Sequence, residues 1–163
     1  MANRIIRLQD IVEEVQKYNP EADTSLIEKA YIFSAKAHEG QLRLSGEPYL
    51  SHSLEVAYLL ATMGLGPVTV SCGLLHDTVE DSAASRDDVE EYFGEEVADV
   101  VNGVTKIGQL VFGDRQTQQA EYIRKMILSM SHDIRVLLVK LADRVHNMRT
   151  LGFMEAPKQK RIA

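Results

Sequence analysis

The sequence has 163 residues, 45% of them hydrophobic, and a formal net charge of −6; this is typical of one soluble domain and argues against direct nucleic-acid binding, which needs a basic surface. The single cysteine, Cys72, excludes a disulfide within the chain and fits a reducing compartment. No segment has the apolar length of a membrane span or the pattern of a signal peptide, so we expect a cytoplasmic protein without membrane contact.

The first part of the chain predicts two helices and a loop. Apolar residues recur at helical spacing in residues 8–18. Ser25 and Glu28 have the spacing of a capping box, which predicts that a second helix begins near Ser25, and Gly40 predicts its end. Residues 40–49 contain two glycines, a proline and a serine, so they are expected to form a loop.

The rest of the chain also predicts helices. Ser51 is expected to cap a third helix, Pro67 to open a fourth, and Ser85 with Asp88 to form another capping box. The apolar pattern predicts three further helices: residues 94–105, 116–131 and 133–150. The last of these is apolar on nearly all sides and should be buried at the centre. We therefore expect an all-α fold, a compact bundle of about eight helices.

The segment LLHDTVED, residues 74–81, concentrates polar chemistry directly after an apolar run. In a helix, His76 and Glu80 would share a face, as would Asp77 and Asp81. The adjacent His76 and Asp77 offer one nitrogen and one oxygen ligand for a divalent cation, which needs further ligands from elsewhere. On its own such a dipeptide more often belongs to a solvated acidic helix end.

Two other segments favour a metal site over that alternative. His52 lies at the start of a predicted helix, and Asp143 lies inside the most apolar helix, where an unpaired charge would be costly. Together with His76 and Asp77 they form a set of two histidines and two aspartates, sufficient for one divalent ion. Four other residues are not expected to bind it. His132 and His146 lack carboxylate partners at helical spacing, His38 is expected to interact with a helix C-terminus, and Cys72 is expected to be a small buried residue.

Four segments in order carry a family resemblance: AHEGQLRLSGEPYLSH, LLHDTVED, FGEEVADVVNGVTK and KLADRVHNMRTL. Together they resemble the N-terminal hydrolase domain of the RelA/SpoT family, stringent-response enzymes that make and degrade guanosine tetra- and pentaphosphate. The resemblance covers about residues 20–163. It implies a helical bundle of the HD-domain phosphohydrolase type over residues 1–163, a fragment of a longer chain whose synthetase and regulatory domains are absent here.

The resemblance also implies a reaction, hydrolysis of the 3′-pyrophosphate to give GDP or GTP and pyrophosphate. It implies one divalent ion, usually manganese, held by the two histidines and two aspartates named above. Glu80 and Asp81 match the pair that acts on the nucleophilic water. Arg43 matches a residue that packs against guanine. The remaining matches line the nucleotide site: Ser45, Asn147 and Thr150.

One departure from the family pattern concerns the phosphates. Many members have a lysine where this chain has Leu44, so one candidate phosphate contact is missing. Two alternative functions remain open from the sequence: a related HD phosphohydrolase acting on another phosphorylated nucleotide, and a non-catalytic nucleotide-binding regulatory domain. The intact pair of Glu80 and Asp81 argues against the second.

Overall fold

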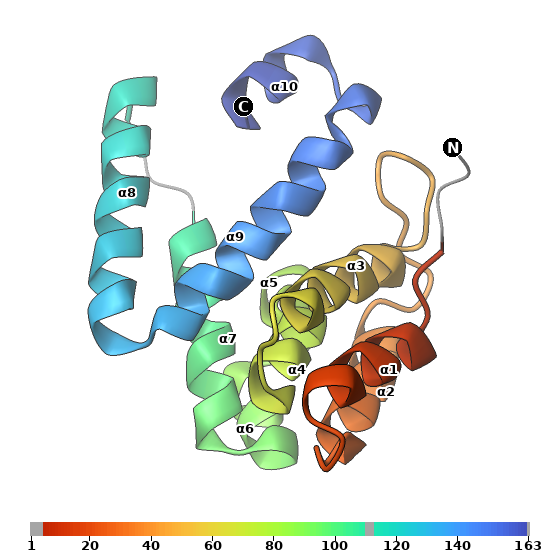
Figure 1. Cartoon of the computed structure of the whole chain (residues 1–163). Helices are drawn as coiled ribbons and strands as arrows, with labels where there is room; N and C mark the ends of the chain where they lie inside the picture. The colour runs from red at the N-terminus through yellow and green to blue at the C-terminus, as the bar shows by residue number, and fades with distance from the viewer. Residues whose placement is uncertain (1–4, 110–112, 163) are drawn as a thin grey trace.

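The computed structural model describes residues 5–109 and 113–162, and helices account for nearly all of their regular structure (Figure 1). The all-α expectation is confirmed, with ten α-helices in these residues against the roughly eight expected. The elements are α1 (Leu8–Tyr18), α2 (Ser25–Ala37), α3 (Tyr49–Thr62), α4 (Pro67–Leu75), α5 (Thr78–Asp81), α6 (Arg86–Phe93), α7 (Glu95–Gly108), α8 (Arg115–His132), α9 (Ile134–Arg149), the 3₁₀ turn η1 (Leu151–Phe153) and α10 (Ala156–Ile162).

The helix starts show which capping predictions hold. Pro67 opens α4 as expected, and Ser85 and Asp88 form the predicted capping box before α6. The box predicted at Ser25 is wrong, because Ser25 is already helical and its main-chain N–H donates instead to Asp23. Ser51 does not cap α3, which begins two residues earlier, directly after a proline. Most of the loop expected after Gly40 is confirmed, and it contains one isolated β-bridge.

Helix α4 lies at the centre of the fold, packed against α2, α3, α7 and α9 (Figure 1). Its residues from Thr69 to Leu75 are all buried, as expected of a helix that is apolar on every side. Gly73 permits the closest approach to α3, since a Cβ there would lie 2.6 Å from Leu60 Cδ1 and 3.1 Å from Ala57 Cα. This contact holds the end of α4 against the second half of α3.

Helix α9 differs from its prediction. It runs across α3, α4 and α7 and buries one face only, formed by Val136, Val139, Ala142, Asp143 and His146. Leu141 and Val145 on the same helix remain 44% and 43% exposed, so the expectation of a helix buried all round is wrong. Helix α8 packs beside α9 and α7 at the edge of the molecule and contains no fully buried residue (Figure 1). None of the described helices combines the length and apolarity that a bilayer crossing requires.

Candidate metal centre

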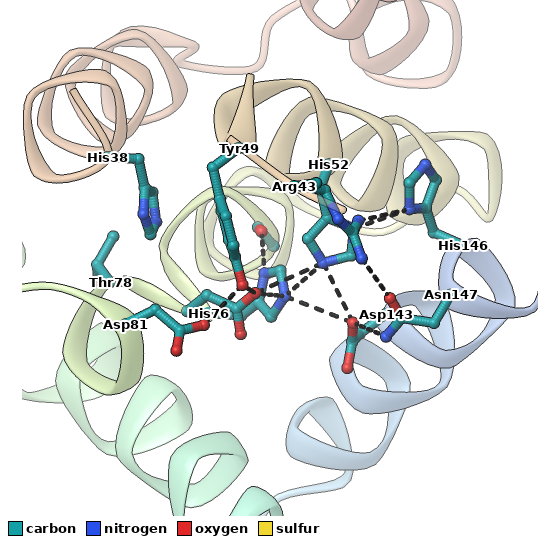
Figure 2. A network of polar contacts seen from close by, with 12 residues as sticks. His38, Arg43, Tyr49, His52, His76, Thr78, Asp81, Asp143, His146 and Asn147 are labelled. Carbon is teal, nitrogen blue, oxygen red and sulfur yellow. Dashed lines mark hydrogen bonds and ion pairs between the residues drawn. The ribbon is translucent and has the colours of Figure 1, made fainter. Parts of the chain in front are cut away.

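Four parts of the chain meet at one polar cluster, shown in Figure 2. The loop before α3 contributes Arg43, and the first turns of α3 contribute Tyr49 and His52. The end of α4 leads into His76 and Asp77. Helix α9 supplies the rest of the cluster: Asp143, His146 and Asn147.

The helix is interrupted within LLHDTVED, so the stretch is nearly helical and not one continuous helix. Helix α4 ends at Leu75, and α5 begins at Thr78, whose hydroxyl donates to the Leu75 carbonyl at 2.7 Å. His76 and Asp77 form the turn between them. His76 Nδ1 lies 2.8 Å from the carbonyl oxygen of Gly73, and because a carbonyl only accepts, this nitrogen carries the hydrogen. Nε2 of His76 is thereby aimed at α3.

The predicted ligand atoms converge. His52 Nε2 lies 3.2 Å from His76 Nε2 and 3.2 Å from Asp143 Oδ1. Asp77 Oδ2 lies 3.0 Å from His76 Nε2 and 3.5 Å from His52 Nε2. The ligand atoms of His52, His76 and Asp143 all fall within 4.8 Å of one another. All four side chains are at least 88% buried. Such a mixed nitrogen and oxygen set suits a divalent transition-metal ion.

The electrostatics of the cluster favour a positive charge at its centre. Burial opposes protonation of His76, but the adjacent Asp77 and Asp143 together raise its pKa to about 10. Burial likewise favours the neutral acids, yet the imidazoles hold the pKa values of Asp77 and Asp143 below their ordinary range. Two buried carboxylates facing two imidazole nitrogens need either a proton or a metal cation between them. The residues present therefore fit a divalent ion.

Asp143 is supported by two further groups on α9. Asn147 Nδ2 donates to Asp143 Oδ1 at 2.7 Å, and Lys140 Nζ lies 3.0 Å from Asp143 Oδ2. These contacts fix the carboxylate plane and satisfy lone pairs that burial would otherwise leave unpaired. The structure thus brings Asn147 to the metal cluster, where sequence reasoning expected it beside the nucleotide.

Tyr49 connects the cluster to the acidic pair. Its hydroxyl lies 2.6 Å from Asp81 Oδ2 and 3.1 Å from Asp77 Oδ2, so it donates between the two carboxylates (Figure 2). Burial and these two charges raise the pKa of Tyr49, which keeps the hydroxyl a donor. Glu80 is exposed and packs against α7, where a Cβ in place of Gly108 would lie 3.0 Å from Oε2. Burial of part of its carboxyl raises the pKa of Glu80.

A cavity of about 300 Å³ opens beside Tyr49. Three predicted substrate residues line it, namely Arg43, Ser45 and Thr150, and so does Leu44, in the position where the family often has a lysine. The guanidinium of Arg43 lies 5.8 Å from the centre of the Tyr49 ring. It also donates to Asn147 Oδ1 at 2.7 Å, which turns it toward the metal cluster.

Two residues of the cluster were not predicted from the sequence. Tyr49 lies three residues before His52, and His146 three residues after Asp143, so each shares a helix face with an expected ligand. The sequence shows no carboxylate partner for His146 at helical spacing, but in the structure its partner is another histidine, His52, at 2.8 Å between Nδ1 atoms. Helical spacing from a ligand is the signal that would have found both.

Comparison with known proteins identifies the family and several relatives of the chain. Residues 30–163 match the family described as HD domain. The GTP pyrophosphokinase rsh of Brucella melitensis is 47% identical over 98% of this chain and 21% of its own length. A guanosine-3′,5′-bis(diphosphate) 3′-pyrophosphohydrolase of Escherichia coli is 50% identical over 91% of this chain and 21% of its own length. The chain thus spans about a fifth of these curated relatives.

A solved structure is also similar, with a TM-score of 0.65 and 26% sequence identity, over 84% of this chain and 79% of that one. It is described as a metazoan ortholog of SpoT that hydrolyzes ppGpp and plays a role in starvation responses. The expected resemblance to RelA/SpoT-type proteins and the HD-type helical fold are therefore confirmed.

Proposed function

The chain belongs to the HD-domain family, and on that premise we propose that it hydrolyses the 3′-pyrophosphate of guanosine tetra- and pentaphosphate, releasing GDP or GTP and pyrophosphate. One observation carries the proposal: the ligand atoms of His52, His76 and Asp143 converge within 4.8 Å, next to a cavity lined by Arg43 and Ser45. The relatives named for this reaction or for synthesis of its substrate support the choice of nucleotide.

The HD family and the buried cluster suggest a divalent metal. We assign it to His52, His76, Asp143 and also Asp77, which lies within 3.5 Å of both imidazole Nε2 atoms, and we propose that one manganese ion is bound. Such an ion would withdraw charge from the phosphate and lower the pKa of a water molecule. Lys140 and Asn147 hold the Asp143 carboxylate in place for it.

We assign the handling of the attacking water and its proton to Asp81 and Glu80. Asp81, held by the Tyr49 hydroxyl at 2.6 Å, orients the water that attacks the phosphorus. Glu80 at the rim accepts the proton, since its raised pKa lies closer to neutrality than that of an ordinary carboxylate. Tyr49 keeps the two carboxylates, Asp77 and Asp81, at a fixed separation, so that the acidic pair stands beside the metal ligands.

Substrate binding is assigned to the cavity beside Tyr49. Arg43 offers a planar guanidinium that stacks on a base, and Ser45 and Thr150 offer hydroxyls from opposite parts of the chain. Asn147, one step from the Asp143 carboxylate, offers an uncharged amide to the sugar. Leu44 gives the same cavity an apolar wall in place of a lysine. Binding of the substrate phosphates therefore depends more on the metal ion.

In this proposal residues 1–163 act as one HD hydrolase domain in the cytoplasm. Its partner in the full-length relatives would be the synthetase domain, and neither a membrane nor a nucleic acid takes part.

The test is hydrolysis of guanosine tetraphosphate with manganese, followed by separate assays of pyrophosphate and orthophosphate. We expect pyrophosphate and GDP in equal amounts, and no release by the His76→Ala variant. Orthophosphate as the product, or turnover of other 2′- or 3′-phosphorylated nucleotides alone, would instead identify a related phosphohydrolase. Tight nucleotide binding without any release would identify a regulatory binding domain.

A further inference from the structure

His146 is buried on α9, behind the metal cluster, and the proposed reaction gives it no role. Its Nδ1 atom lies 2.8 Å from Nδ1 of His52 and 3.2 Å from the NH1 group of Arg43 (Figure 2). The side chains come from three different parts of the chain: α9, α3 and the loop before α3. His146 is only 7% exposed, and its ring centre lies 4.8 Å from that of His52.

The donors and acceptors of this contact fix the position of each proton. A guanidinium can only donate, so the nitrogen that faces Arg43, Nδ1 of His146, must be an acceptor without hydrogen. The proton between the two Nδ1 atoms must then be on His52. A neutral His52 with its hydrogen on Nδ1 has a free lone pair on Nε2, the atom that lies 3.2 Å from Asp143 Oδ1 within the cluster.

The Arg43 guanidinium is also connected to a second proposed metal ligand, Asp143. NH2 of Arg43 donates to Asn147 Oδ1 at 2.7 Å, and Asn147 Nδ2 donates to Asp143 Oδ1 at 2.7 Å. Since the Asn147 oxygen accepts from Arg43, its amide nitrogen is the group turned to the carboxylate. Arg43 is therefore connected by hydrogen bonds to two proposed ligands, to His52 through His146 and to Asp143 through Asn147.

We infer that His146 is a positioning residue for the metal site, the obligatory acceptor for the His52 Nδ1 proton, and that Arg43 keeps it in this accepting tautomer. A hydrogen bond to the distant nitrogen of a ligating histidine fixes both its tautomer and its ring orientation. Arg43, expected from the sequence to contact only the guanine base, then also supports metal binding. The inference rests on the metal site of the proposed function and is independent of its substrate.

The first experiment compares two variants of similar shape. His146→Asn places an amide oxygen near the Nδ1 position, whereas His146→Leu fills the same space without an acceptor. The manganese affinity of each is measured by calorimetry without nucleotide. We expect the leucine variant to bind about 10–100-fold more weakly, the usual effect of losing such a support, and the asparagine variant to stay close to wild type. Equal affinities in the two variants would overturn the inference, because packing alone would then explain His146.

The second experiment reads the tautomer directly. Nitrogen-15 NMR of histidine-labelled, metal-free protein at neutral pH should show His146 with hydrogen on Nε2 and none on Nδ1. In Arg43→Ala the Nδ1-protonated form should appear, while circular dichroism shows unchanged helix content. Hydrogen on His146 Nδ1 in the wild type would overturn the inference. If the wild type bound no divalent ion, the metal site itself would be wrong, and this spectrum would still decide whether His146 is the acceptor.

Discussion

The Nε2 atoms of His52 and His76 lie 3.2 Å apart, with less than 2% of either side chain exposed. Each Nδ1 is already used, by His146 for His52 and by the Gly73 carbonyl for His76. The two Nε2 atoms therefore face each other and the carboxylates of Asp77 and Asp143. Such a geometry is stable only with positive charge at its centre, and this determines how the fold should respond to pH and to metal.

Without metal, the stability of the fold should fall as the pH rises. The folded-state pKa of His76, about 10, lies above its ordinary 6.5, so protonated His76 stabilises the fold fully below about pH 6.5. That contribution is lost as the pH rises through about 10. We expect the thermal unfolding midpoint in the presence of a chelator to decrease across this window. A saturating divalent cation should reduce the decrease, because it replaces the proton.

Two variants check the origin of this effect. His76→Asn removes the titrating group, so its unfolding midpoint should stay flat over the same pH range. His132→Asn changes an exposed histidine at the end of α8 and should behave as the wild type does. A decrease of equal size in all three proteins would assign the titration to other groups.

The side chains that the sequence singled out as candidate metal ligands lie together in the fold, and three of the four have a local reason to be noticed. Asp143 is a charge within an apolar helix, and His76 with Asp77 is a polar pair after an apolar run. The fold class followed from helical spacing and from caps such as Ser85. Predictions failed where tertiary contacts decide. The two-residue turn at His76 and Asp77, where the imidazole contacts the Gly73 carbonyl, is not marked by a glycine or proline within LLHDTVED.

The contacts that support the proposed ligands could not be predicted from the sequence either. His146 and Arg43 are 103 residues apart, and His52 and His146 are 94 apart. A histidine is assigned a role by what lies opposite each nitrogen, and this is known only once the chain has folded. The one-sided burial of α9 was missed for a related reason, since apolar composition does not state how many neighbours a helix will have.

Asp143→Asn should remove metal binding and destabilise the protein. The change leaves the Lys140 ammonium, 14% exposed, without its carboxylate partner at 3.0 Å. Breaking a buried pair from one side costs roughly 3–5 kcal/mol, measurable by urea unfolding in the presence of a chelator. Glu91→Gln, the same kind of change at an exposed position on α6, is the matched control and should have little effect. Retained manganese binding in Asp143→Asn would remove Asp143 from the ligand set.

Tyr49→Phe should slow turnover and leave the metal bound. The change removes the hydroxyl that joins Asp77 and Asp81 but keeps the ring stacked on His38, 4.6 Å between centres. A hydrogen bond to a charged group contributes about 1.5–3 kcal/mol, which corresponds to a roughly 10–100-fold lower kcat. Tyr58→Phe on the same helix is the control. A change in manganese affinity as large as the change in kcat would mean that Tyr49 acts on the ligand Asp77 alone.

Glu80→Gln tests the division of work within LLHDTVED. The amide keeps the shape of the carboxylate and its packing against Gly108, but it cannot accept a proton at neutral pH. Loss of a positioned base costs about 10²–10⁴-fold in rate, so the variant should bind manganese and nucleotide normally and turn over at least ~100-fold more slowly.

Because burial raises the pKa of Glu80, the acid limb of the wild-type kcat/KM profile should lie above the ordinary pKa of a glutamate, and Glu80→Gln should remove that limb. Loss of the metal in this variant would instead make Glu80 a ligand or its direct support. A near-normal rate with the acid limb intact would mean that Asp81, not Glu80, accepts the proton. Asp81→Asn would then show the larger loss of rate.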